Sequence, residues 1–120
     1  MNPPVEEHRR SPRIFTAVEI HYEVVHRQRA KVTVTRDLSI EGVCAFFDTP
    51  LSPGATLTLT LDLPGELSPL VTQAGVVWMH PLHRPTHPLY EAGLRFIDMD
   101  VLDRRRLLKY LTSVRPVLSE

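Results

Sequence analysis

The amino-acid sequence predicts an all-β fold, a six-stranded antiparallel β-barrel with one C-terminal α-helix. The first observation is a period-two alternation of apolar and polar residues in about six short runs, bounded by Pro, Gly or Asp. The second is the close spacing of these runs, which is typical of an antiparallel barrel. The third is a change to helical spacing near residue 100. A barrel this small fills its interior with its own side chains, so we expect any ligand to bind outside it.

The elements follow one another in a simple order along the chain. The expected strands cover residues 18–24, 30–35, 43–47, 55–64, 70–79 and 89–97. Residues 80–88 contain three prolines, which predicts a loop. Four apolar residues at helical spacing predict a helix over about residues 101–114, with Asp100 as its N-cap. These four residues are Leu107, Leu108, Leu111 and Val114.

The chain is expected to form one domain, because its 120 residues suffice for a single modest core. The domain would span residues 9–114, with an arginine-bearing arm at 9–13 and a barrel over about 14–98. Residues 1–8 are polar and rich in proline, which predicts a flexible tail. Residues 115–120 are expected to form a second tail.

Composition excludes several classes of protein. Fourteen basic and fourteen acidic residues give a formal net charge of zero, which argues against a non-specific binder of nucleic acid or membranes. Cys44 is the single cysteine, so no internal disulfide can form. No apolar run has the length of a signal peptide or a membrane span. These features predict a cytoplasmic protein without membrane insertion.

The strand that begins at residue 30 leads into the segment TRDLSIEGVCAFF, which places polar residues at a strand joint. We expect Val32 and Val34 to point into the barrel, so that odd-numbered positions face outward. Continued along the strand, this alternation places Asp37 and Ser39 side by side on the outer surface. A plain hairpin would need only a turn residue such as Gly42, so Asp37 and Ser39 suggest a site.

A second polar cluster lies upstream, in the segment HRRSPR. Arg9, Arg10 and Arg13 fall within five residues, and Pro12 disfavours a helix there. Arginine meets phosphate, and the O6 and N7 atoms of guanine, with paired donors. A carboxylate accepts the donors on the other edge of guanine, and hydroxyl or backbone N–H groups can hold a phosphate oxygen. The two clusters together suit a guanine-bearing phosphate ligand.

Arg9-x-x-x-Arg13 followed by Asp37-x-Ser39-x-x-Gly42 resembles the two-part signature of the PilZ domain family. That family consists of bacterial six-stranded barrels that bind cyclic di-GMP. The similarity extends over roughly residues 7–114 and includes SPGATLTLTLDLP, GVVWM, YEAGLRF and the leucine-rich helix. Each motif alone is weakly specific, but both motifs in this order within a barrel-like pattern are fairly specific.

The resemblance implies roles for individual residues. Arg9 and Arg13 would contact guanine and phosphate, and Arg10 would add a phosphate or stacking contact. Asp37 and Ser39 would be the contacts on the barrel, and Gly42 would shape their turn. The resemblance also implies that His8, which precedes the motif, lies at a position where the family varies and where ligand stoichiometry is tuned.

Each of these residues also has a purely structural interpretation. The arginines alone would suit a solvated tail, and Asp37 and Ser39 could bond to nearby backbone in a turn. Gly42 is expected to supply a positive φ. Trp78 stays open between stacking on a base and packing in the core.

Other conspicuous residues are predicted to have no part in the site. His80, His83 and His87 lie in the proline-rich loop without helical spacing, so a solvated loop is favoured over a metal site. Arg104, Arg105 and Arg106 are expected on the solvated face of the helix, where a role in recruiting a partner stays open. Cys44 is expected to be buried or half-buried.

The leading hypothesis is a cyclic di-GMP receptor and adaptor that orders its arginine arm on the barrel when the ligand binds, and so signals to an unidentified effector protein. The alternative is a PilZ-like interaction module that binds no nucleotide. A barrel that binds RNA or single-stranded DNA is disfavoured by the neutral charge and by only 7% aromatic residues. No Walker loop, nucleophile elbow or paired carboxylates are present, so we expect neither an enzyme nor a cofactor. The sequence does not predict the regulated process, the stoichiometry of the ligand or the oligomeric state.

Overall fold

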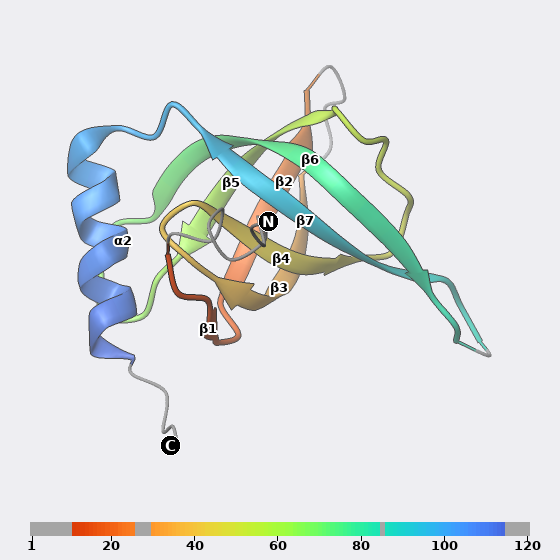
Figure 1. Cartoon of the computed structure of the whole chain (residues 1–120), viewed down its shortest axis with the longest axis horizontal. Coiled ribbons are helices and arrows are strands. Elements are labelled where there is room, and N and C mark those ends of the chain that lie inside the picture. Colours follow the sequence, from red (N-terminus) through yellow and green to blue (C-terminus); the bar gives the residue numbers. More distant parts are fainter. Residues whose placement is uncertain (1–10, 26–29, 85, 115–120) are drawn as a thin grey trace, which may run out of the picture.

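A computed structural model describes residues 11–25, 30–84 and 86–114 of the chain. It contains a closed antiparallel barrel of six strands, and the prediction of fold class is confirmed (Figure 1). The barrel strands are β2 (Glu19–Val24), β3 (Lys31–Leu38), β4 (Gly42–Phe47), β5 (Thr56–Asp62), β6 (Leu70–Leu82) and β7 (Leu89–Ile97). They pair in the order β3–β2–β5–β6–β7–β4, and β4 pairs back onto β3. The predicted tails, at 1–8 and 115–120, lie outside the described residues.

An additional short strand, β1 (Ile14–Phe15), pairs with the end of β3, so that Phe15 faces Asp37 across the ladder. These residues were predicted to belong to the barrel, but no separate strand was expected there. β1 matters for function because it fixes the chain directly after Arg13 against β3, next to Asp37.

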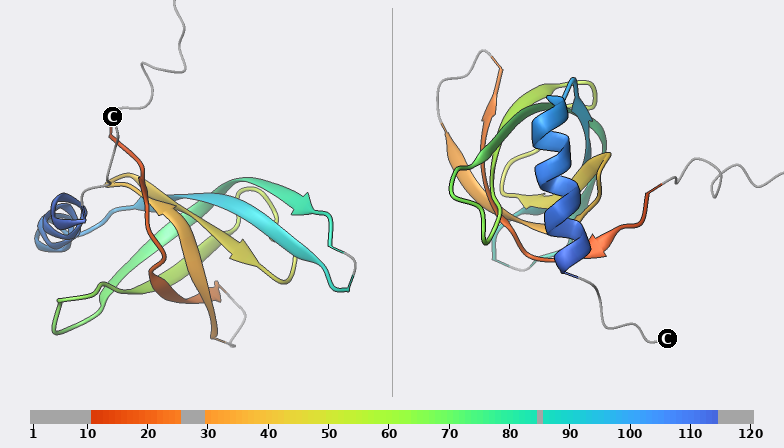
Figure 2. Two further views of the ribbon diagram at one scale, coloured as in Figure 1. Left: turned by 90° about the horizontal axis from the view of Figure 1, so that it is seen from below. Right: turned by 90° about the vertical axis from the view of Figure 1, so that its left-hand side faces the viewer.

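Helix α2 (Val101–Ser113) lies across one end of the barrel (Figure 2). Asp100 caps it as predicted, because its side chain accepts a hydrogen bond from the backbone N–H of Leu102 at 3.0 Å. Leu107, Tyr110 and Leu111 are the buried residues of the helix. Leu108 is exposed, because one residue along a helix is a rotation of about 100°, which carries its side chain away from the buried face of Leu107.

The core is formed by the alternating apolar residues of the strands. The four leucines of the β5 region at positions 57, 59, 61 and 63 are all buried, as the period-two pattern predicts. The end of β6 differs from its prediction. It extends to Leu82 and pairs with Leu89, so His80 and Pro81 belong to a strand and not to the predicted loop.

No helix in the described ranges has the length and apolar character needed to cross a membrane.

Candidate functional site

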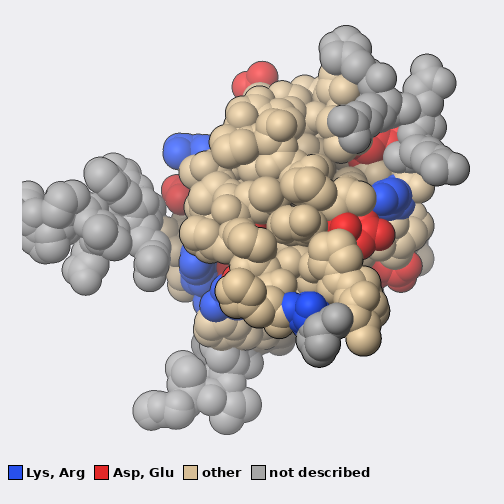
Figure 3. Space-filling model, turned by 90° about the vertical axis from the view of Figure 1, so that its right-hand side faces the viewer, with Lys and Arg blue, Asp and Glu red and all other residues tan. Residues whose placement is uncertain are grey.

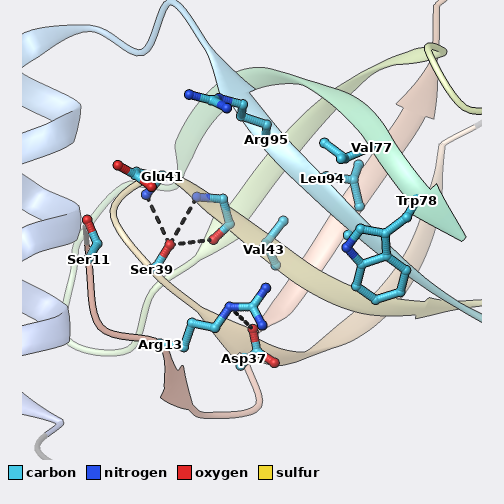
Figure 4. A pocket seen from close by; sticks show the side chains of 12 residues that line it. Ser11, Arg13, Asp37, Ser39, Glu41, Val43, Val77, Trp78, Leu94 and Arg95 are labelled. Atoms are coloured by element: carbon cyan, nitrogen blue, oxygen red, sulfur yellow. Dashed lines mark hydrogen bonds and ion pairs between the residues drawn. The ribbon is translucent and has the colours of Figure 1, made fainter. Parts of the chain in front are cut away.

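A pocket of about 530 Å³ lies on the outside of the barrel, between the segment that precedes β1 and strands β3, β4, β6 and β7 (Figure 4). Pockets for small molecules commonly have volumes of about 300–1,000 Å³. The lining includes every described residue that the sequence analysis singled out for ligand contact: Arg13, Asp37, Ser39, Gly42 and Trp78. Arg9 and Arg10, together with His8, lie outside the described residues. The segment that contains Arg13 and the β3–β4 region, which are far apart in sequence, therefore line the same pocket together with Trp78.

The expected side-chain alternation in β3 was wrong, and a β-bulge explains why Asp37 still faces the pocket. Val32 and Val34 are 54% and 46% exposed, so the first half of β3 has its even positions outward. Between Thr35 and Asp37 the register with β4 shifts, so that Thr35 faces Ala45 while Asp37 faces Cys44. This bulge at Arg36 adds one residue and reverses the alternation, which turns Asp37 to the outer side.

Two cross-strand rows confirm the outward direction of Asp37. Leu38, Val43, Leu94 and Val76 are aligned across β3, β4, β7 and β6, and all four belong to the core. The neighbouring row consists of Asp37, Cys44, Gly93 and Trp78. Adjacent residues of a strand point to opposite faces, so this second row lies on the outside of the barrel.

Trp78 forms one wall of the pocket because Gly93 leaves space for its indole. A Cβ at Gly93 would overlap the indole ring. The indole also stacks with the ring of His80, with 4.9 Å between the centroids and 29° between the planes. The indole is half-buried, and its placement in the pocket lining favours a stacking role over a core role. A base stacked on such a ring gains about 1–3 kcal/mol.

The carboxylate of Asp37 is buried and incompletely hydrogen-bonded. Its side chain is 3% exposed, with Oδ1 at 3.8 Å from Nε of Arg13 and Oδ2 at 3.6 Å from Nε of Arg36. Both distances are those of ion pairs without a hydrogen bond. Oδ2 has no hydrogen-bond donor in the part of the chain that the structure describes. A buried acceptor left in this state costs about 1–3 kcal/mol, which a ligand with N–H donors would recover.

Ser39 begins the turn between β3 and β4, and Gly42 is the first residue of β4. The hydroxyl of Ser39 accepts hydrogen bonds from the backbone N–H groups of Glu41 and Gly42, at 3.1 and 3.2 Å (Figure 4). Ser39 is therefore a turn residue as well as part of the pocket wall. The prediction of a positive φ at Gly42 was wrong, because the described glycines with positive φ are Gly54 and Gly65. Gly42 is required for a different reason, since a Cβ there would collide with the carbonyl oxygen of Leu94.

Asp37 has a charged neighbour, Arg36, which is itself paired with Glu91. Arg36 is hydrogen-bonded to Glu91 of β7, and its guanidinium carbon lies 5.7 Å from the centroid of the Phe15 ring. The hydrogen bond to Glu91 is the main reason that the pKa of Arg36 is raised above its ordinary value. The thiol of Cys44 donates to Oε2 of Glu91 at 3.5 Å, and burial raises the pKa of this thiol to about 12. Cys44 is thus buried as expected, and it is uncharged at neutral pH.

Several pocket residues were missed by the sequence analysis. Ser11, Glu41, Val77 and Arg95 line the pocket, and Arg95 lies on β7 across the hollow from Arg13 and Asp37 (Figure 4). Arg95 is placed there by its pairing with Gly42 and Gly75, which one sequence does not reveal. Gly93 did carry a usable signal, because a glycine inside a strand often marks a close approach of another group.

The remaining candidate residues lie elsewhere. His80 is on β6, and His83 and His87 are exposed near the tip of the β6–β7 hairpin. Among the described residues, no three His, Cys, Asp or Glu side chains gather as a metal-binding group. Arg104 and Arg105 are exposed on α2, as expected. Arg106 is not simply solvated, because it is bonded to Glu66 and Asp103, each at 2.9 Å.

Comparison with known proteins establishes the family. Residues 7–113 match the model of the PilZ domain, and the chain belongs to that family. A search of curated proteins finds no match. Among solved structures, the PilZ domain of YcgR from Escherichia coli with c-di-GMP superposes with a TM-score of 0.70 at 17% identity, over 88% of this chain and 90% of that one.

Two larger proteins contain a similar fold. The inhibitor of motility MotI/DgrA from Bacillus subtilis gives a TM-score of 0.70 at 21% identity, over 92% of this chain and 55% of that one. The K. pneumonia MrkH–c-di-GMP complex gives 0.71 at 20% identity, over 88% of this chain and 52% of that one. The chain therefore spans about half the length of these two proteins, and the likeness concerns the fold.

Proposed function

We propose that this protein is a cyclic di-GMP receptor whose ligand occupies the pocket between Arg13, Asp37 and Trp78. The observation that carries the proposal is the Asp37 carboxylate, which is buried in the pocket wall with an oxygen that lacks a hydrogen-bond donor among the described residues. Guanine presents two N–H donors on one edge, which such a carboxylate can accept. The family and the ligand-bound YcgR and MrkH structures point to the same ligand class.

Each pocket wall offers a different contact to this ligand. The guanidinium of Arg13 can meet a phosphate or the O6 and N7 atoms of guanine. The indole of Trp78 can stack on a base. We propose that Arg9 and Arg10 join Arg13 on the ligand, that Ser39 and Gly42 shape the opposite side, and that the protein acts by binding and not by catalysis.

We also propose an adaptor role in which ligand binding alters a surface that an effector protein recognises. The support is a connection between the pocket and α2. The segment that supplies Ser11 and Arg13 to the pocket continues to Thr16, whose hydroxyl is hydrogen-bonded to that of Tyr110 at 2.9 Å. Because Thr16 lies only three residues after Arg13, a shift of Arg13 towards a ligand can reach the helix through this short segment.

The test is calorimetric titration with cyclic di-GMP, with GTP and cyclic di-AMP as controls. We expect a Kd in the micromolar range or below, equivalent to about −8 kcal/mol or better. Arg13→Ala should weaken binding, whereas Arg105→Ala removes the same side chain from the exposed face of α2 and should bind like the parent. Absence of both heat and thermal shift at near-millimolar ligand would refute the receptor and favour the interaction module without nucleotide.

An RNA-binding role has less support. On the face of the molecule at the end of the β6–β7 hairpin, basic and acidic side chains are interspersed and do not gather by sign (Figure 3). Binding to a nucleic-acid backbone depends on clustered positive charge. The pocket instead combines single groups suited to one nucleotide ligand.

A further inference from the structure

We propose that Arg95 and Glu41 form a second nucleotide subsite in the same pocket, which binds the other half of a cyclic dinucleotide and so selects it over a mononucleotide. This inference rests on the proposed function, because it takes cyclic di-GMP as the ligand. Arg13, Asp37 and Trp78 together suit one guanine and one phosphate. Cyclic di-GMP contains two of each, so its second half needs contacts of its own.

The first argument is the set of charged residues in the described pocket lining. This set consists of two arginines, Arg13 and Arg95, and two acids, Asp37 and Glu41. Arg13 and Asp37 form one ion pair, with 3.8 Å between Nε and Oδ1. Figure 4 shows Arg95 and Glu41 on the other side of the pocket, away from Asp37. The pocket therefore offers an arginine and a carboxylate on each side, which matches a ligand of two identical halves.

The second argument is the backbone around Arg95. In the sheet, Arg95 pairs with Gly42 of β4 and with Gly75 of β6. Because glycine has no side chain, neither neighbouring strand shields the Arg95 side chain from a ligand in the pocket. The backbone carbonyl of Glu41 accepts a hydrogen bond from the N–H of Phe96 at 2.9 Å, which holds Glu41 beside β7 next to Arg95.

The third argument is that both side chains are available to a ligand. Neither Arg95 nor Glu41 forms an ion pair within the described ranges of the chain, whereas Arg13 does. Arg95 is exposed and Glu41 is half-buried. A guanidinium meets phosphate, or the O6 and N7 atoms of guanine, with paired donors. The carboxylate of Glu41 can accept the N–H donors on the other edge of the second guanine.

The test compares cyclic di-GMP with cyclic GMP, which carries one guanine and one phosphate. Affinities are measured for the parent, Arg95→Ala, Arg13→Ala and Arg105→Ala, which removes an exposed arginine from α2. In Arg95→Ala we expect the affinity for cyclic di-GMP to fall about 10- to 100-fold, because a charge-assisted contact is lost. Its affinity for cyclic GMP should stay within about twofold of the parent value. Arg13→Ala should weaken both ligands, and Arg105→Ala neither.

The role of Glu41 is tested with cyclic GMP–AMP, in which one guanine of the ligand is replaced by adenine. The parent should prefer cyclic di-GMP by about tenfold, because adenine lacks the pair of donors that Glu41 would accept. Glu41→Gln should reduce this preference, since an amide does not require donors on both of its positions. A preference equal to that of the parent would overturn the assignment of Glu41.

NMR titration extends the test to weak binding. Cyclic GMP is followed through the indole N–H of Trp78, and saturating cyclic di-GMP should shift the Nε–H resonance of Arg95 in the parent. The Arg95 shift needs no cyclic GMP and decides the proposal where that ligand binds too weakly. Thermal melts of all variants exclude unfolding as the cause of lost affinity.

Two results would overturn the subsite. One is an Arg95→Ala variant that binds cyclic di-GMP like the parent, with no shift of the Arg95 resonance in the parent. The other is an Arg95→Ala variant that loses affinity for cyclic GMP as strongly as for cyclic di-GMP. Absence of cyclic di-GMP binding by the parent would instead refute the proposed function, so the two failures are distinguishable.

Discussion

Replacing Asp37 by alanine should weaken ligand binding while it changes the stability of the fold only slightly. The carboxylate is buried, and Oδ2 lacks a hydrogen-bond donor among the described residues, which costs the fold about 1–3 kcal/mol. The compensating ion pairs are weak, because Arg13 and Arg36 are 43% exposed and water screens them. Two screened ion pairs contribute about 0–1 kcal/mol each and oppose this cost, so the free energy of unfolding should change by about 1 kcal/mol. For a domain of this size that is about 4 °C in Tm.

Affinity should respond differently to the same change. Loss of the paired contacts to a base weakens binding by about 1–3 kcal/mol, which is roughly 5- to 150-fold in Kd. Calorimetric titration with cyclic di-GMP and a thermal melt of Asp37→Ala measure the two quantities on one sample. Ser39→Ala is the comparison, and it should lose less affinity because one hydroxyl is removed. A Tm lowered by more than 10 °C in Asp37→Ala would show that the carboxylate braces the turn, and the reasoning would fail.

Three further predictions follow from single positions. Gly42→Ala should unfold or strongly destabilise the protein, because the new Cβ meets the backbone carbonyl of Leu94, which cannot move without breaking the sheet; a melt like that of the parent would contradict this. Gly93→Ala should retain the fold but displace the half-exposed indole of Trp78, which shifts the emission of the single tryptophan and weakens ligand binding by up to about 1–3 kcal/mol; unchanged emission and affinity would exclude the wall role. Cys44 should resist a thiol reagent at pH 8 in the folded protein and react in denaturant, because its pKa of about 12 keeps the folded thiol protonated. The stability of the protein should fall as the pH rises above 9.0, the ordinary pKa of a thiol, since the thiol then ionises only in the unfolded chain. Cys44→Ala should remove that part of the pH dependence.

The fold class was predictable because period-two alternation is a local property of the sequence. The leucines at every second position from Leu57 were correctly predicted to form one buried face of a strand. Strand β7 (Leu89–Ile97) was predicted with its observed bounds. The failures occurred where tertiary pairing overrides the local pattern. The first three residues of the loop predicted over 80–88 belong instead to β6, because Pro81 pairs with Tyr90 and Leu82 with Leu89.

The pocket was predictable in its residues but not in its geometry. Asp37 was correctly predicted to point outward, but for a wrong reason. The prediction assumed that Val32 and Val34 point into the barrel, whereas both are exposed. The bulge at Arg36 reverses the alternation before Asp37 and so turns Asp37 outward. A bulge depends on the register with β4, which the sequence of β3 alone does not contain. For the same reason Arg95 and Glu91 were missed, since their approach to the site depends on pairings between strands distant in the chain.

Residues 14–16 connect the pocket, where we propose that the ligand binds, to helix α2. Arg13 lines the pocket, and Ile14, the next residue, is buried and paired with Leu38 of β3. Two residues further, Thr16 is hydrogen-bonded to Tyr110 on the inner face of α2. A movement of the Arg13 backbone towards a ligand would be transmitted to Ile14 in the core and to the helix contact. Because buried core residues resist displacement more than a single hydroxyl contact does, we infer that the helix contact yields first. That order would make α2 the element through which an effector senses the ligand.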